Sequence, residues 1–193
     1  MNPLFLAAQE VFGVLQEFKV PACLIGGMAL QRWGEPRLTL DIDLTLITDL
    51  KTQEQIVDSL LTRFKPRISD AKNFALTRRV LLLQASNGIG IDLALGITSF
   101  ETETVERSSL YEFAPGFVFP TCSAEDLVVH KCFAGRGRDL ADVETVIARN
   151  LGRRLDLRYI RHWLRELEQA AENPEISARF ETLLQKAGPD APR

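Results

Sequence analysis

Residues 24–47 read LIGGMALQRWGEPRLTLDIDLTLI, and this stretch decides the fold. In its second half, apolar side chains alternate with threonine or aspartate, and the two aspartates are Asp41 and Asp43. Such alternation is typical of a β-strand because successive side chains point to opposite faces of a sheet. The pattern predicts a strand over residues 38–47 that presents both carboxylates on one face, roughly 6.5–7 Å apart.

A glycine pair precedes this strand. Gly26 and Gly27 follow the short apolar segment 22–25, which suits a buried strand, and lead into a predicted helix over residues 28–33. Free backbone N–H groups at the start of a helix bind phosphate oxygens. A tight turn that needs small residues would also explain the pair, so the glycines alone leave both interpretations open.

Asp92 lies in the second of two predicted strands, residues 79–85 and 89–96, which are joined by a dipeptide typical of hairpin turns. A lone carboxylate within an apolar strand is costly unless it is paired or bound to a metal. If this strand lies beside residues 38–47, three carboxylates converge, as a two-metal phosphoryl-transfer site requires. Their oxygen atoms favour Mg²⁺, or Mn²⁺ in its place. The alternative is a solvated sheet face that binds no ligand.

The remainder of the chain is mostly helical, above all after residue 120. The predicted helices span residues 4–18, 52–64, 124–134, 138–149, 156–171 and 175–186, with an irregular or extended segment at 111–119 and a frayed tail at 188–193. We therefore predict an α+β fold. A small mixed sheet flanked by helices would occupy residues 1–120, and a C-terminal helical cap would occupy residues 121–193.

Composition excludes several classes of protein. The formal charge of −3 and the pI near 5.5 argue against a protein that coats nucleic acid through net charge. The apolar N-terminal residues are interrupted by Glu10 and Glu17 and lack a basic leader, so they do not resemble a signal peptide. No stretch approaches the roughly 18–20 apolar residues of a membrane span. We expect a cytoplasmic protein with no membrane partner and with reduced cysteines.

On these motifs the chain resembles a known family. Residues 24–44, with their glycine turn followed by the Asp-x-Asp strand, look like the core of DNA polymerase β-type nucleotidyltransferases. They are most similar to the branch that contains the AbiEii/AbiGii toxins of bacterial abortive-infection systems. Residues 123–142, SAEDLVVHKCFAGRGRDLAD, are also similar to that branch, so the resemblance covers residues 20–145.

The resemblance implies a metal-dependent enzyme that moves a nucleoside monophosphate from an NTP to an acceptor. The acceptor would be tRNA or another RNA, a protein or a small molecule, and a toxin would have an antitoxin protein as its partner. The implied catalytic and metal-binding residues are Asp41, Asp43 and Asp92, and the implied nucleotide-binding residues include Gly26, Gly27 and Lys131.

The glycine turn departs from the family pattern. Many members have Gly-Ser at this turn, with the serine hydroxyl on a phosphate, whereas this chain has Gly26-Gly27. Main-chain donors still serve phosphate binding, but efficient transfer depends more on the serine. The alternative function is therefore a catalytically degenerate domain of the same fold, which binds a nucleotide or a protein.

Three further residues are candidate nucleotide contacts. Thr39 shares the face of the carboxylates, although an ordinary β-branched strand residue would also suit that position. Arg37 would neutralise a phosphate or pair with Glu35. Arg136 lies in the glycine-interrupted segment between two predicted helices, where it would face the site.

The C-terminal region contains charged residues with structural explanations. Asp126 stands three residues after Ser123, which is capping-box spacing. Asp142 lies one helical turn from Arg138, which favours a salt bridge between them. A stripe of arginines at helical spacing would hold an RNA backbone or pair with an acidic partner helix, and it consists of Arg154, Arg158, Arg161 and Arg165.

Overall fold

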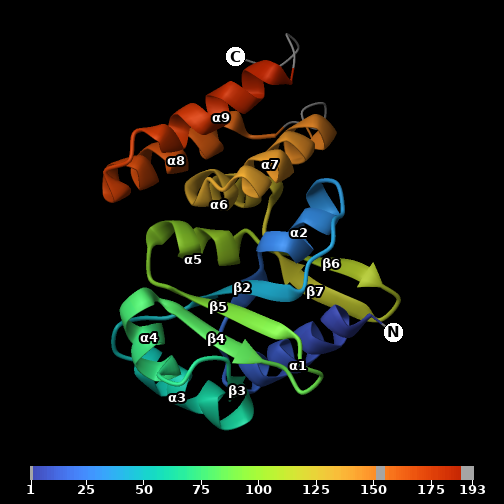
Figure 1. Ribbon diagram of the computed structural model, residues 1–193, viewed down its shortest axis with the longest axis vertical. Coiled ribbons are helices and arrows are strands. Elements are labelled where there is room, and N and C mark those ends of the chain that lie inside the picture. Colours follow the sequence, from blue (N-terminus) through green and yellow to red (C-terminus); the bar gives the residue numbers. More distant parts are fainter. Residues whose placement is uncertain (1, 151–154, 188–193) are drawn as a thin grey trace. The chain divides into compact units, whose positions relative to one another are not determined.

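The computed structural model describes residues 2–150 and 155–187, and these fall into two compact units (Figure 1). Unit 1 consists of the described residues in Met1–Met28 and Leu38–Cys122. Unit 2 consists of the described residues in Ala29–Arg37 and Ser123–Arg193. Helix α2 (Gly26–Trp33) therefore begins in unit 1 and ends in unit 2. The predicted frayed tail, residues 188–193, lies outside the described residues.

Unit 1 is built on a mixed sheet, and the described residues contribute seven strands to it in the order β3-β4-β5-β2-β1-β7-β6. The strands are β1 (Ala22–Leu24), β2 (Asp41–Ile47), β3 (Lys65–Pro66), β4 (Val80–Gln84), β5 (Gly90–Gly96), β6 (Ser109–Ala114) and β7 (Phe117–Thr121). Strand β2 pairs in parallel with β5, and β1 pairs in parallel with β7. The other neighbouring strands are antiparallel.

Helices cover both faces of this sheet. They are α1 (Pro3–Glu17), α3 (Gln53–Arg63), α4 (Ala71–Arg78) and α5 (Ser99–Glu106). Buried side chains of α1, α3 and α4 share one core with Ile42, Leu44 and Leu46 of β2. Helix α5 contacts β1 and β2, and in Figure 1 it lies on the opposite side of the sheet from α1. The alternating pattern thus buries one face of β2 and leaves Asp41 and Asp43 on the other face, only partly buried.

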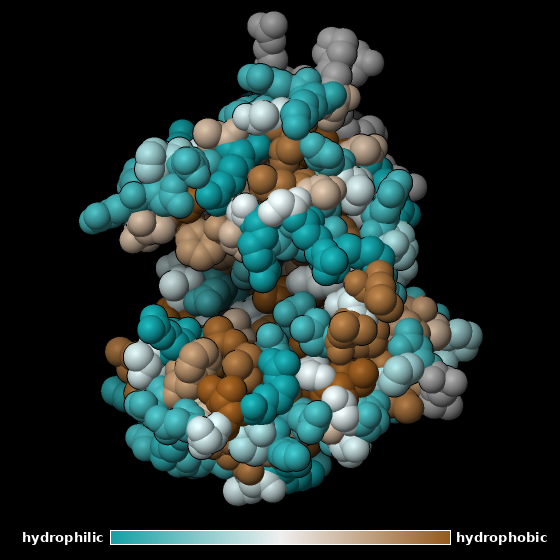
Figure 2. Space-filling view, viewed as in Figure 1, coloured by the Kyte–Doolittle hydropathy of each residue, from teal (hydrophilic) through white to brown (hydrophobic). Residues whose placement is uncertain are grey.

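Unit 2 is helical. Besides the end of α2 it contains α6 (Ala124–Ala134), α7 (Gly137–Asn150), α8 (Leu157–Ala171) and α9 (Glu175–Lys186). Helix α6 packs against the other three. Phe180 of α9 and Ile160 of α8 are fully buried, whereas hydrophilic side chains cover the outer surface of both helices in Figure 2. No helix among the described residues is long and apolar enough to span a membrane.

The α+β prediction is confirmed, and the structure differs from the expected elements at a few places. Strand β2 begins at Asp41 rather than at residue 38, because its parallel partner β5 begins at Gly90, the residue opposite Asp41. Leu38 and Leu40 consequently lie outside the ladder and are 80% and 73% exposed. The segment expected to be irregular or extended at 111–119 is the hairpin of β6 and β7. Helices α4 and α5 were not predicted.

Candidate active site

The two acid-bearing strands are neighbours in the sheet. Asp43 of β2 lies directly opposite Asp92 of β5, and Asp41 lies opposite Gly90. The register therefore places all three carboxylates on one face, in two adjacent strands. Among the described residues, no three histidine, cysteine or acidic side chains are grouped as metal ligands. Instead, Asp92 forms an ion pair with the guanidinium of Arg67.

The environment of Asp92 changes its acidity. Burial raises the pKa of this carboxyl group, and the negative charge of Asp41 raises it further. The positive charge and hydrogen bond of Arg67 act in the opposite direction but do not outweigh these effects. Asp92 is thus a stronger base than an exposed aspartate, which is the property of a group that accepts a proton.

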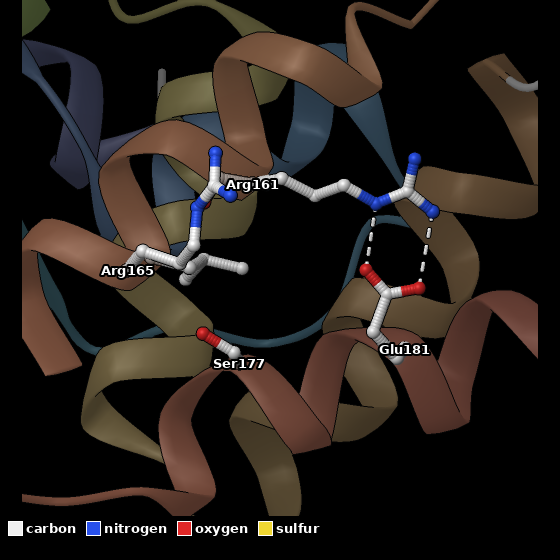
Figure 3. A pocket seen from close by; sticks show the side chains of 5 residues that line it. Arg161, Arg165, Ser177 and Glu181 are labelled. Carbon is white, nitrogen blue, oxygen red and sulfur yellow. Dashed lines mark hydrogen bonds and ion pairs between the residues drawn. The ribbon is translucent and has the colours of Figure 1, made fainter. Parts of the chain in front are cut away.

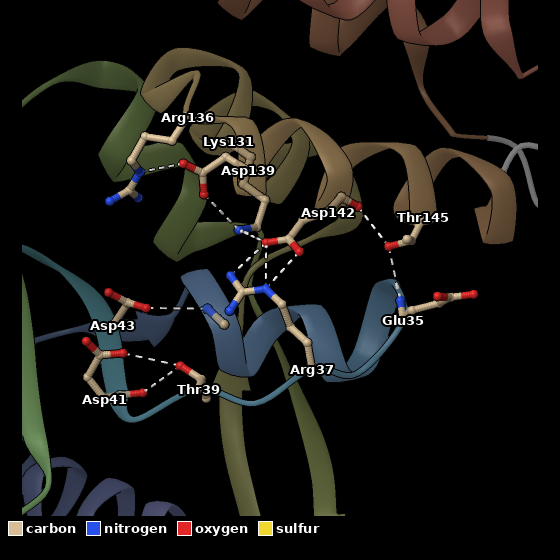
Figure 4. Close-up of polar contacts among 11 residues, drawn as sticks. Glu35, Arg37, Thr39, Asp41, Asp43, Lys131, Arg136, Asp139, Asp142 and Thr145 are labelled. Atoms are coloured by element: carbon tan, nitrogen blue, oxygen red, sulfur yellow. Dashed lines mark hydrogen bonds and ion pairs between the residues drawn. The ribbon is translucent and has the colours of Figure 1, made fainter.

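The glycine turn is joined to the carboxylates by direct contacts. Gly26 has a φ of +61°, a left-handed conformation that glycine adopts without strain. The next residue, Gly27, donates its backbone N–H to Oδ2 of Asp43 at 3.3 Å (Figure 4). A Cβ atom on Gly26 would lie 2.7 Å from the Cβ of Asp43. The turn therefore needs glycine for two reasons, its backbone conformation and the space that Asp43 occupies.

We predict that Gly26→Ala lowers the free energy of unfolding by about 2–4 kcal/mol, because left-handed backbone strain and overpacking add together. Urea denaturation would measure this change. Gly13→Ala is the matched control, since Gly13 lies within α1 and a Cβ there would meet nothing within 4 Å. The control should gain up to about 1 kcal/mol from higher helix propensity. An equal effect of the two substitutions would refute the assigned role of the turn.

Thr39 fills the space beside the second glycine of the turn. A Cβ on Gly27 would lie 2.6 Å from the Oγ1 of Thr39 and 2.9 Å from its Cβ. The threonine is buried, and its hydroxyl donates to Oδ1 of Asp41 at 3.2 Å. A side chain at position 27 and the side chain of Thr39 therefore compete for one place. In this chain the hydroxyl group beside Gly27 is therefore that of Thr39.

The other predicted nucleotide contacts lie in unit 2, where they take part in a cluster of ion pairs. The ammonium group of Lys131 is 2.7 Å from Oδ2 of Asp142 and 3.2 Å from Oδ1 of Asp139. Arg37 donates to both oxygens of Asp142, and Arg136 donates to Oδ2 of Asp139 at 2.6 Å. Figure 4 shows these three cations converging on the two carboxylates. The side chains of Lys131, Asp139 and Asp142 are at most 6% exposed.

This cluster corrects one expectation from the sequence. Asp142 pairs with Arg37 and Lys131 rather than with Arg138. Burial by itself would raise the pKa of the Asp142 carboxyl, but the hydrogen bonds and charges of Arg37 and Lys131 bring it below its ordinary value. Asp142 is therefore ionised within unit 2 and serves as a shared anion for the two cations.

The structural explanation of the capping residue is confirmed. Ser123 and Asp126 form a reciprocal capping box at the start of α6, with their side chains 2.6 Å apart. The hydroxyl of Tyr159 also donates to Asp126 at 2.6 Å, so α8 is tied to the same cap. The Asp126 carboxylate thus stabilises the helices of unit 2.

The arginine stripe of α8 pairs in part with its partner helix. Arg161 forms a two-pronged ion pair with Glu181 of α9, with N–O distances of 2.7 and 3.0 Å (Figure 3). Arg165 donates to the backbone carbonyl of Arg161 at 3.2 Å. Arg154 lies outside the described residues. At Arg161 the acidic-partner interpretation is therefore the correct one.

Sequence reasoning missed Arg67, the ion-pair partner of Asp92. Arg67 follows β3, and its backbone N–H donates to the carbonyl of Leu82 in β4. Two signals were present in the sequence, a basic residue just past a helix and the small residue Gly90 two positions before Asp92. Neither signal is specific without the order of the strands.

A mixed sheet that carries three aspartates on two adjacent strands, next to a glycine turn that opens a helix, defines the nucleotidyltransferase class. Residues 12–192 match the family described as nucleotidyl transferase AbiEii toxin, type IV toxin–antitoxin system. The chain belongs to this family and is a nucleotidyltransferase. The family implies a nucleotide substrate and an antitoxin partner. No curated protein sequence matches the chain.

Three solved structures are similar to the chain at low sequence identity. The antibiotic-resistance factor ANT(2'')-Ia is 16% identical, with a TM-score of 0.50 over 94% of this chain and 95% of that one. A nucleotidyltransferase-like antigen from Paracoccidioides brasiliensis is 15% identical over 92% and 90%, with a TM-score of 0.49. The lincosamide adenylyltransferase LnuA is 14% identical over 72% and 94%, with a TM-score of 0.47. The likeness to ANT(2'')-Ia supports the fold alone.

Proposed function

We propose that this protein is a divalent-metal-dependent enzyme that transfers a nucleoside monophosphate from an NTP to a hydroxyl group of an RNA. The observation that carries the proposal is the register of β2 and β5, which sets Asp43 opposite Asp92 with Asp41 on the same face. The glycine turn that donates an N–H to Asp43 supplies a phosphate-binding helix start beside these carboxylates. RNA is one of the acceptors that the family resemblance implies.

The donor set fits a divalent metal. Three aspartates on a partly exposed sheet face offer the hard oxygen ligands that Mg²⁺ and Mn²⁺ prefer. Asp41, Asp43 and Asp92 would hold the metal, which would polarise the phosphate oxygens and neutralise the charge that develops during transfer. The backbone N–H groups of the turn at Gly26 and Gly27 would bind the β- and γ-phosphates, for which Gly27 would release its hydrogen bond to Asp43.

Asp92 would act as the proton acceptor. A carboxylate at this place would remove the proton from the attacking hydroxyl. That oxygen forms a bond to the α-phosphorus, the bond from this phosphorus to the bridging oxygen breaks, and pyrophosphate leaves. The catalysis would come from positioning and from neutralising charge rather than from a covalent enzyme intermediate.

The direct test uses purified protein, Mg²⁺ or Mn²⁺, each NTP labelled at its α-phosphate, and total tRNA. Label on RNA that is lost in the Asp41→Ala/Asp43→Ala variant would support transfer to RNA. Label on a small molecule, with none on RNA, would mean that the transfer reaction is as proposed but that the acceptor is a small molecule. The absence of both products would refute the proposal.

Thr39 would supply the hydroxyl at the turn, and a substitution cycle tests this role. Gly27→Ser alone should weaken NTP binding because its side chain collides with Thr39. Thr39→Gly alone should weaken it by removing the hydroxyl, by about fivefold for one hydrogen bond. The double variant Gly27→Ser/Thr39→Gly removes both the hydroxyl and the Cβ of residue 39, moves the hydroxyl to residue 27, and should bind more tightly than either single variant. Equilibrium dialysis with labelled ATP measures these affinities, and additive losses would contradict the role.

A non-catalytic domain of the same fold is the second candidate function. The observation that favours it is Gly27, which leaves the turn without a serine hydroxyl. Such a domain would bind an NTP, and Asp41→Ala/Asp43→Ala would abolish the binding, but no product would form with any acceptor. The labelled-NTP assay and the dialysis measurement together separate the two functions.

The predicted contacts at Lys131, Arg37 and Arg136 remain proposals for nucleotide binding. Each of these cations already forms an ion pair with Asp139 or Asp142 within unit 2. A phosphate bound by any of these cations would have to compete with these carboxylates. Their contribution to nucleotide affinity would therefore be smaller than that of the turn.

A further inference from the structure

Arg67 and Asp92 meet across an intervening strand. The N–H of Arg67 donates to Leu82, and Leu82 lies opposite Asp92 in the β4–β5 ladder. The backbones of Arg67 and Asp92 are thus two strand spacings apart, roughly 10 Å. Only a long side chain spans this distance, and the arginine reaches over β4 to the carboxylate. Both side chains are 31% exposed, so solvent and ions reach the pair.

The path of the Arg67 side chain depends on Gly90, which has no side chain. A Cβ on Gly90 would lie 2.8 Å from Nη1 of Arg67 and 3.4 Å from the Cβ of Asp41. The guanidinium therefore passes over Gly90 and reaches Asp92 on the same strand, β5. It occupies the face of the sheet from which a divalent cation would contact these carboxylates.

We propose that Arg67 is a positioning residue: it acts as an internal counter-cation for Asp92, holds this carboxylate in place and competes with the divalent metal for it. This inference rests on the proposed metal site. Asp41, Asp43 and Asp92 are three anions on one face, and their mutual repulsion requires a nearby cation. Arg67 provides that positive charge and keeps Asp92 in place on the sheet. Metal binding then requires Asp92 to exchange the guanidinium for the metal.

Mn²⁺ binding to the full-length protein tests this competition without any nucleotide or acceptor. Arg67→Gln should tighten Mn²⁺ binding roughly fivefold, the scale of a partly exposed ion pair. The titration is read from the electron paramagnetic resonance signal of free Mn²⁺. Arg63→Gln is the matched control, because it removes an arginine whose ion pair with Glu17 on the same unit involves none of the three aspartates. The control should leave Mn²⁺ affinity unchanged.

A substitution cycle separates competition from simple charge repulsion. If Arg67 acts through Asp92, Arg67→Gln should have no effect on Mn²⁺ affinity in an Asp92→Asn background. If the arginine merely repels the metal, the tightening should persist in that background, and the proposal would be overturned. Gly90→Ala provides an independent test, because it retains the charge of Arg67 but crowds its guanidinium away from Asp92. This variant should also tighten Mn²⁺ binding.

Unchanged or weaker Mn²⁺ binding in Arg67→Gln would also overturn the proposal. These measurements do not depend on nucleotide transfer. A protein that transfers nucleotides normally but shows no tightening would refute the competition alone. A protein that shows the tightening but forms no product would refute the proposed function alone.

Discussion

Asp43→Asn is expected to lower the rate of nucleotide transfer by about 10³-fold, the scale of losing one preorganised electrostatic contact to the reacting phosphate. The amide keeps the shape of the side chain and still accepts the N–H of Gly27, but it loses the negative charge that holds the metal. Initial rates with labelled NTP at saturating acceptor measure the loss. The folded state should be at least as stable as the wild type, because repulsion from Asp92 is relieved.

The control for this variant is Asp58→Asn in helix α3 of the same unit. Asp58 pairs with Lys72 at 2.8 Å, and its side chain is 52% exposed, so the transfer rate should not change. Circular dichroism would establish that both variants are folded. Transfer by Asp43→Asn within threefold of the wild-type rate would remove Asp43 from the catalytic residues.

Much of the sheet could be predicted from local pattern. The alternation around Asp41 and Asp43 identifies β2 because a strand with one buried face has a period of two. Strand β2 nevertheless begins three residues later than predicted, because the first pair of its ladder with β5 is Asp41 and Gly90. The ladder begins where β5 begins, at Gly90, and no local pattern of residues 38–40 predicts that position.

Helices α4 and α5 show a different limit. Both are only eight residues long, and α5 has few apolar residues, so their periodicity is weak. Helix α5 does carry a readable start signal, since Thr98 and Glu101 form a capping box. The charged and polar residues that follow the capping box lack an apolar helical period, so the segment does not resemble a helix. Short helices of this kind are fixed by packing onto the sheet rather than by their own sequence.

Some residues of the candidate site could likewise be predicted from local sequence, whereas others depend on the whole fold. Asp92 was identified because a lone acid in an apolar strand needs a partner. Its observed partner, Arg67, depends on the order β3-β4-β5, which is a property of the whole sheet. Lys131 could be placed on a helix, but its burial between Asp139 and Asp142 depends on the packing of α6 against α7. Local sequence patterns predict strands and helices more readily than they predict ion pairs between side chains of different strands or helices.

Asp142→Asn is expected to lower the free energy of unfolding by about 3 kcal/mol, because it removes one partner of a buried, charged network. The carboxylate is shared by Arg37 and Lys131, and its side chain is only 6% exposed. For a chain of this length the melting temperature should fall by roughly 6–12 °C. Thermal unfolding followed by circular dichroism measures the change. Glu144→Gln on the same helix is the control, because its pair with Lys186 is 3.5 Å apart and largely exposed.

The pH dependence of this variant distinguishes a charge effect from a packing effect. The pKa of Asp142 is lowered in the folded protein by Arg37 and Lys131, which outweigh burial. A lowered pKa contributes stability above the ordinary value of 3.8, and this contribution is lost as the pH falls through the folded value. The difference in melting temperature between wild type and Asp142→Asn should therefore be full at pH 7 and shrink below about pH 4. A difference that does not depend on pH would mean that the shape of the side chain, and not its charge, stabilises unit 2.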